Sequence, residues 1–223
     1  MNFNLNAAKA LLGAAVVAGA VTAISQPASA ISVNTGGTPS AGNGQVSSYG
    51  GVTTLDFNTD SLGARPDGGT IVNGSISGQY AAPPSDTSNY LAVLGGKTAT
   101  FDLGGLKGYF GLFVGSLDTY NTIEFINTIA GTSKSLTGSM VAAMTGTPST
   151  GNQGVGVYYN FFGDNNSDLF NKVALSSTAN AFEVDNIATR TAIPTPALLP
   201  GLIGMGVAAW RKRRGESVEQ SEA

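Results

Sequence analysis

The chain of 223 residues contains no cysteine and no histidine. Without these side chains it lacks the usual zinc ligands, thiol nucleophiles, imidazole bases and haem attachment points. It also lacks the disulfides that stabilise many exported domains, so we expect its stability to come from core burial or bound ions. Because most catalytic templates are excluded, we assign no catalytic residue and expect a protein that is not an enzyme.

Charged residues are scarce as well. They make up 11% of the chain, and the formal net charge is −3. A protein that binds nucleic acid usually carries a basic patch or stripe, and the central region has none, so we expect no nucleic acid among its partners. The length leaves room for one medium-sized domain once the two ends are set aside.

Residues 1–30 have the pattern of a secretory signal peptide. Lys9 lies before an apolar run from Leu11 to Ile24, and the small residues Ala28 and Ala30 suit the pockets of signal peptidase. The apolar run is shorter than the roughly 20 residues that a permanent membrane-spanning helix needs. We therefore predict a signal helix, export by the secretion machinery and cleavage after Ala30.

The other end carries a short apolar stretch followed by a basic cluster, which consists of Arg211, Lys212, Arg213 and Arg214. By the positive-inside rule, this cluster stays in the cytoplasm and the preceding domain lies on the outer face of the membrane. Several glycines interrupt the stretch, so it forms a marginal span. We predict a transient hydrophobic helix within residues 191–214 and a cytoplasmic tail over residues 215–223.

A proline motif comes directly before the apolar stretch and consists of Pro194, Thr195, Pro196 and Ala197, with a Pro200–Gly201 step after it. Together with the glycine-rich span and the basic cluster, it resembles the PTPA variant of the PEP-CTERM sorting domains. In that family an exosortase, a membrane-embedded cysteine transpeptidase, is thought to cut near the motif and pass the protein to the cell surface or extracellular matrix. The resemblance implies an exosortase as partner, and an uncleaved tail anchor is the alternative.

Between the two ends, the sequence has the pattern of many short strands. Apolar residues alternate with polar ones or gather in β-branched and aromatic runs, with Gly, Asn, Ser and Pro between the runs. The predicted strands cover residues 52–57, 70–76, 90–94, 98–103, 109–115, 122–126, 155–161, 172–176 and 182–187. No convincing helical spacing occurs, so no helix is predicted here. Gly95–Gly96 and Gly104–Gly105 predict hairpin turns.

About nine such strands predict an all-β fold, a β-sandwich that forms the extracellular domain over residues 31–190. We favour a jelly roll over an immunoglobulin-like sandwich because the chain has no Cys-Trp-Cys framework. The N-terminal signal helix and the short C-terminal hydrophobic helix would flank this domain. Residues 34–48 are rich in Gly, Ser and Asn, which predicts a mobile lead-in before the first strand.

Two motifs of the central region resemble motifs of the same group of proteins. The first is a turn that contains Gly115, Ser116, Asp118, Tyr120 and Asn121, and the second reads Phe-Glu-Val-Asp-Asn-Ile over residues 182–187. Both are similar to motifs of exosortase-dependent surface proteins, where the turn joins two core strands and the later strand closes the domain. This resemblance implies location and architecture, and it implies no reaction.

One candidate metal site follows the first predicted strand. Asp56, Asn58 and Asp60 place oxygen ligands at alternate positions, as in half of a calcium loop, but Ser61 stands where an EF-hand has its glycine. The spacing predicts a looser structural Ca²⁺ site as the one candidate cofactor, and capping of a turn by these side chains is the alternative. Residues 164–168 form a similar cluster, for which a solvated turn is the simpler interpretation.

Three functions stay open at this point. The leading hypothesis is an exported, non-catalytic cell-surface or extracellular-matrix protein that contacts extracellular polysaccharide or a neighbouring copy. The second is a calcium-dependent, lectin-like carbohydrate-binding module that uses tyrosines with planar amides and acids. The third is a glycoside hydrolase with Glu124 and Glu183 as its carboxylate pair, although outward-facing strand positions commonly carry acids.

Overall fold

The computed structural model describes residues 31–58 and 68–191, and these form an all-β fold in which every pairing between the named strands is antiparallel. The predicted signal peptide, the sorting motif with its basic cluster, and Asp60 lie outside the described residues. None of the helices within the described ranges has the length and apolar character needed to cross a membrane.

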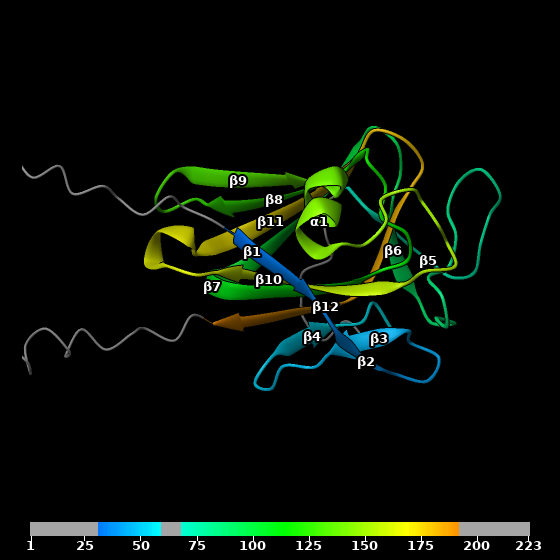
Figure 1. Ribbon diagram of the computed structural model, residues 1–223, viewed down its shortest axis with the longest axis horizontal. Coiled ribbons are helices and arrows are strands. Elements are labelled where there is room, and N and C mark those ends of the chain that lie inside the picture. Colours follow the sequence, from blue (N-terminus) through cyan, green and yellow to red (C-terminus); the bar gives the residue numbers. More distant parts are fainter. Residues whose placement is uncertain (1–30, 59–67, 192–223) are drawn as a thin grey trace, which may run out of the picture.

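The described chain forms twelve strands, one α-helix and one short 3₁₀ helix (Figure 1). In chain order they are β1 (Ile31–Thr35), β2 (Gly37–Pro39), β3 (Gln45–Ser47), β4 (Thr53–Leu55), β5 (Thr70–Val72), β6 (Tyr90–Val93), β7 (Lys97–Val114), β8 (Asn121–Asn127), β9 (Thr132–Thr137), α1 (Gly138–Thr145), β10 (Val157–Gly163), η1 (Asn166–Asp168), β11 (Phe170–Ser177) and β12 (Phe182–Thr191). The main sheet runs β5-β6-β12-β7-β11-β8-β9, and β10 joins β7 to β1.

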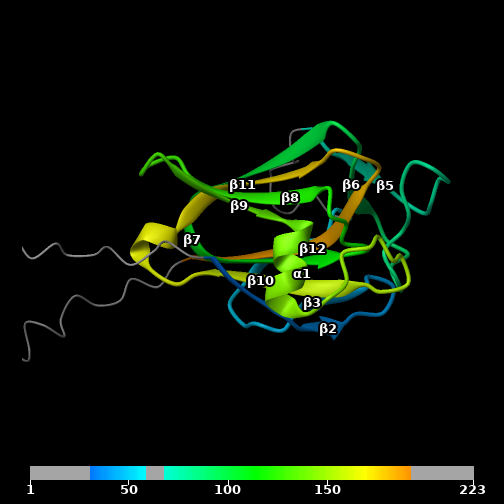
Figure 2. The same ribbon diagram turned by 45° about the horizontal axis from the view of Figure 1, so that its top comes forward.

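The long strand β7 connects the two layers of this sandwich-like fold. Its first part pairs with β11 and its last part pairs with β10 and β12. Figure 1 and Figure 2 accordingly show β8, β9 and β11 on one side of the molecule and β10 and β12 on the other. Between the two parts, Gly104 and Gly105 have φ angles of 66° and 151°. The hairpin predicted at these glycines was wrong, because their conformational freedom bends one strand and does not reverse the chain.

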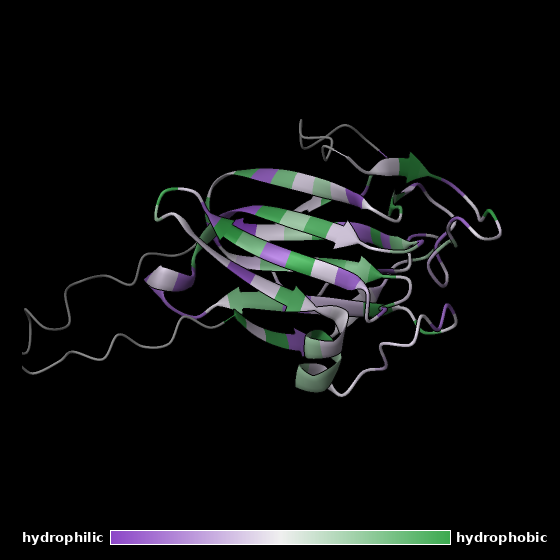
Figure 3. Cartoon of the chain, turned by 90° about the horizontal axis from the view of Figure 1, so that it is seen from above, coloured by the Kyte–Doolittle hydropathy of each residue, from purple (hydrophilic) through white to green (hydrophobic). Residues whose placement is uncertain are grey.

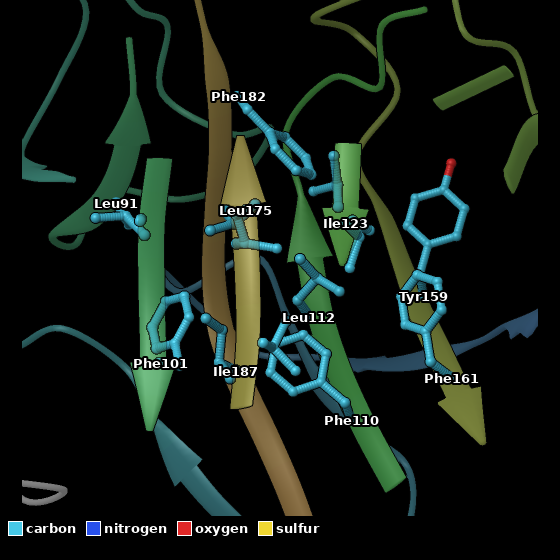
Figure 4. Close-up of a cluster of buried hydrophobic side chains, with 14 of the residues drawn as sticks. Leu91, Phe101, Phe110, Leu112, Ile123, Tyr159, Phe161, Leu175, Phe182 and Ile187 are labelled. Carbon is cyan, nitrogen blue, oxygen red and sulfur yellow. The ribbon is translucent and has the colours of Figure 1, made fainter. Parts of the chain in front are cut away.

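The core lies between the layers and is filled by aromatic and aliphatic side chains (Figure 4). Along β8 every second residue is buried, and Figure 3 shows this alternation as changing colours along the strands. The ring of Phe125 has its centroid 4.9 Å from that of Phe170, 5.2 Å from that of Phe161 and 5.9 Å from that of Phe110. Burial of such rings stabilises the fold without disulfides.

The helix α1 is a feature that the apolar spacing did not predict. Thr137 caps its first turn by accepting a hydrogen bond from the Met140 backbone N–H at 3.2 Å, and Gly146 ends it with a φ of 72°. Val141 is fully buried, whereas Met140 and Met144 are exposed. A helix of eight residues that buries so few side chains gives no clear period of apolar residues in the sequence. The Thr and Gly caps were the signal that could have identified the helix.

The predicted mobile lead-in, residues 34–48, is built into the fold as the end of β1 and the β2–β3 hairpin. Buried amides hold it, since Asn160 Nδ2 donates to the Gly36 carbonyl at 3.0 Å and Asn186 Nδ2 donates to the Gln45 carbonyl at 3.0 Å. Gly44 packs so closely that a Cβ there would come 2.1 Å from the Phe113 ring. The expectation of mobility came from composition, which cannot distinguish a glycine that serves close packing, such as Gly44, from one that gives flexibility.

Two further differences concern the strand pattern. The turn at Gly95–Gly96 is tight, with the Lys97 N–H donating to the Leu94 carbonyl at 3.0 Å. The flanking strands β6 and β7 do not form the predicted hairpin, however, because β12 lies between them. The count of about nine strands was also low. The strands β1, β2, β3 and β9 were missed, whereas the two predicted runs 98–103 and 109–115 belong to β7.

Candidate functional site

The turn motif and the late strand motif lie against each other. The turn, residues 115–120, connects β7 to β8, and the Gly115 N–H donates to the Glu183 carbonyl at 3.0 Å. Tyr120 Oη donates to the Asn180 carbonyl at 3.2 Å, just before β12. The two motifs that resemble those of exosortase-dependent proteins therefore form one structural unit at one end of the sandwich.

Within the turn, polar side chains hold the backbone. Asn121 is fully buried, and its Oδ1 accepts from the Asp118 N–H at 2.7 Å while its Nδ2 donates to Ser177 Oγ at 3.1 Å. Burial raises the pKa of Asp118, and the nearby Tyr120 hydroxyl partly opposes that shift. Ser116 is buried beside them. These residues stabilise the turn, which explains their spacing without a ligand.

A pocket of about 580 Å³ opens next to this unit, and we call it the loop-end pocket. Three loops of the described chain meet there, at the right-hand end of Figure 1. Their side chains are mainly planar amides, hydroxyls and one tyrosine. The lining residues are Ser75, Ile76, Ser77, Gly78, Gln79, Tyr80, Ala81, Gln153, Asn180, Ala181 and Glu183.

Glu183 is the acid of this pocket and is only 2% exposed. Burial raises the pKa of its carboxyl group and the negative charge of Asp118 adds to the rise, while a hydrogen bond from the Ala81 N–H to Oε1, 2.9 Å long, opposes it. Behind the pocket, Tyr90 Oη donates to the Gly74 carbonyl at 2.6 Å, and its ring meets that of Tyr80 edge-on. The pocket wall is therefore held by the sheet.

The structure does not bring together the two glutamates considered as a catalytic pair. Glu124 lies on β8 and Glu183 on β12, and the strands β7 and β11 lie between them in the sheet. The carboxylate whose charge acts on Glu183 is Asp118. Glycoside hydrolysis needs two carboxyl groups on either side of one bond. Among the described residues lining the loop-end pocket, Glu183 is the only acid.

The residues of the predicted calcium loop act as caps of a turn. Asp56 Oδ1 accepts from the Asn58 N–H at 3.1 Å, and Asn58 Oδ1 accepts from the Asn89 N–H at 2.9 Å. The cluster at residues 164–168 also bonds within itself, with Asn165 Nδ2 donating to Asp168 Oδ2 at 2.8 Å. In the ranges that the structure describes, no group of three or more acids lies close enough to hold a metal ion.

A different pair of acids, which the sequence reasoning missed, lies buried beneath the same loops. We call Asp86 and Asp185 the buried acid pair: Asp185 is fully buried on β12, and Asp86 is 5% exposed in the loop before β6. The sequence contains a pattern that could have identified Asp185 as a buried acid. Glu183 and Asp185 are two residues apart on one strand, so they share a face, and two acids on one face of a closing core strand need an explanation.

The chain was also compared with known proteins. No protein-family model, no curated protein and no solved structure matches it.

Proposed function

We propose that this chain is an exported, non-catalytic protein of the cell surface or extracellular matrix, sorted and processed by an exosortase through its C-terminal tail. The support for export and sorting is the sequence of the two ends, with the signal pattern of residues 1–30 and the proline motif before an apolar stretch and a basic cluster. The described domain adds the β-rich body that such a protein would display.

The role of the displayed domain is to bind a polar ligand such as extracellular polysaccharide in the loop-end pocket. The lining of this pocket supports the proposal: Gln79 and Gln153 supply amides, and Tyr80 supplies an aromatic face. Sugar hydroxyls are recognised by such planar donors and acceptors, and sugar rings stack on aromatic faces. The volume of about 580 Å³ lies within the range of small-molecule sites.

We also propose that the sandwich is a jelly roll. Two pairs of consecutive strands are separated in the sheet, because β12 lies between β6 and β7 and β11 lies between β7 and β8. Crossing connections of this kind are typical of Greek-key arrangements, from which jelly rolls are built.

A calcium-dependent, lectin-like module is the second candidate function. It is favoured by Glu183, whose buried carboxyl group lines the polar pocket, and by the buried acid Asp185 two residues further along β12. A glycan that binds in the presence of Ca²⁺ and is lost on addition of chelator would select this function over a calcium-independent one.

The sorting proposal is tested by mass spectrometry of the protein released from the cell surface. We expect a mature N-terminus at Ile31 and a C-terminus near Pro194 to Ala197. Recovery of surface protein that still ends at Ala223 would contradict exosortase processing and leave a simple tail anchor.

The binding proposal is tested on a panel of polysaccharides with the exported protein and the variant Gln79→Ala/Gln153→Ala. A ligand should bind the wild type, and the double variant should bind it on the order of tenfold or more weakly, because two hydrogen-bonding amides are lost. Lys134→Ala on the exposed strand β9 is the matched control and should bind normally. Equal binding by wild type and double variant would place the ligand elsewhere.

A further inference from the structure

The buried acid pair has polar atoms that the described protein leaves without a partner. Asp86 Oδ1 accepts two hydrogen bonds from Ser88, one from its N–H at 2.9 Å and one from its Oγ at 2.6 Å. Asp86 Oδ2 and Asp185 Oδ1 are shielded from solvent, and neither has a hydrogen-bond partner among the described residues. A buried oxygen of this kind destabilises the fold when it is unsatisfied, and more so when it is charged.

The two carboxyl groups also face each other. The charge of Asp86 acts on Asp185, and Ser88 Oγ lies between them, 2.6 Å from Asp86 Oδ1 and 3.5 Å from Asp185 Oδ2. Through Ser88 the pair joins strand β12 to the loop before β6.

The electrostatic surroundings of the pair are negative. Burial raises the pKa of Asp185 to about 9, and the charges of Asp86 and Asp56 add to the rise, while a backbone hydrogen bond at Asn186 opposes it. The negative charge of Asp86 also raises the pKa of Tyr90, and that of Asp185 raises the pKa of Tyr158. Neither tyrosine supplies a positive charge. Within the described ranges, Arg190 lies over the ring of Tyr109 and no lysine or arginine forms an ion pair with Asp86 or Asp185. Two carboxyl groups buried together are stabilised when a proton or a bound cation neutralises part of their charge.

We infer that Asp86 and Asp185 hold a Ca²⁺ ion between strand β12 and the loop before β6. Calcium takes six to eight oxygen ligands from carboxylates, carbonyls, hydroxyls and water, so two acids with Ser88 Oγ supply a core of the set. Mg²⁺ dehydrates reluctantly and keeps several waters, which suits a buried site less well. A proton shared by the two acids is the competing explanation, and titration with Ca²⁺ distinguishes it from a bound ion.

This site differs from the one that the spacing of Asp56, Asn58 and Asp60 predicts, because it joins segments far apart in the sequence. It also has a place in the proposed binding function. Ala81 donates to Glu183 in the loop-end pocket, and Asp86 lies five residues later in the same loop. An ion on the buried acid pair would fix that loop, and hence the pocket wall, against β12. The ion site itself depends neither on sorting nor on the identity of the pocket ligand.

The test uses the exported protein, stripped with chelator and titrated with CaCl₂ alone. We expect calorimetry to show one ion per chain and the melting temperature to rise with Ca²⁺ to a plateau. Asp185→Asn should weaken Ca²⁺ binding on the order of a hundredfold and remove most of the rise in melting temperature. Glu124→Gln, which removes an acid on β8, should behave as the wild type. Mg²⁺ at the same concentration should have a smaller effect.

A second measurement keeps the test decisive if Asp185→Asn does not fold. Tb³⁺ bound to the wild type should luminesce through energy transfer from Tyr90, which feels the charge of Asp86, and Ca²⁺ should displace it. The inference is overturned if the wild type binds no Ca²⁺ at millimolar concentration, or if Asp185→Asn and Asp86→Asn both fold and bind Ca²⁺ normally. In either case the polysaccharide and mass-spectrometry results would be unaffected, so failure of this site is distinguishable from failure of the proposed function.

Discussion

Replacement of Phe125 by alanine tests whether the two layers pack as the structure has them. Phe125 lies on β8 and is 2% exposed, and its ring contacts Phe161 of β10 in the opposite layer as well as Phe110 and Phe170. Truncation of a buried phenylalanine costs about 3–5 kcal/mol through lost burial and the cavity that remains. Each lost ring pair is worth about 0.5–1.5 kcal/mol beyond its buried area, which favours the upper part of that range.

The assay is urea unfolding of the exported protein, followed by circular dichroism in the β region. A domain of this kind has a total stability of about 5–15 kcal/mol, so the variant should fold but unfold at a clearly lower urea concentration. Ile129→Ala is the matched control, because Ile129 lies in the β8–β9 turn and is 74% exposed. Its effect should stay within about 0.5 kcal/mol. A loss below 1 kcal/mol for Phe125→Ala would refute the packing of β8 against β10.

Two further predictions concern the hairpin β2–β3 and the buried acid pair. Gly44→Ala should destabilise the protein by about 1–3 kcal/mol in the same unfolding assay, because Gly44 has a φ of 63° and the new Cβ would collide with Phe113. Gly50→Ala is the control, since a Cβ at Gly50 meets open space and the change should be nearly neutral. In chelator, the free energy of unfolding of the wild type should fall as the pH rises from 5 to 9. The pKa of Asp185 in the folded state is raised to about 9. The folded state therefore keeps a proton that the unfolded state releases near pH 4. Asp185→Asn should flatten this dependence of the unfolding midpoint on pH, and an unchanged slope would show that Asp185 is not the titrating group.

The site could be predicted from the sequence only in part. The turn with Asp118 and Asn121 and the strand with Glu183 were identified as motifs, and the structure joins them through the bond from the Gly115 N–H to the Glu183 carbonyl. Gln79, Gln153 and Asn180 gave no signal of their own, because each lies in an ordinary polar loop. They form a pocket only where three loops distant in sequence meet.

The sequence by itself determined the all-β class of the central region, since alternation with period two follows from the geometry of a strand and is local. Most predicted runs recur as strands, and the absence of cysteine already excluded disulfides, which left core burial or bound ions to stabilise the fold. Only the tertiary structure shows that Gly104 and Gly105 bend β7 between two layers and that Asp86 lies near Asp185. Strand pairing and side-chain burial depend on contacts between residues that are distant in the sequence. Such contacts result from the sum of many weak interactions, and no short sequence pattern specifies them.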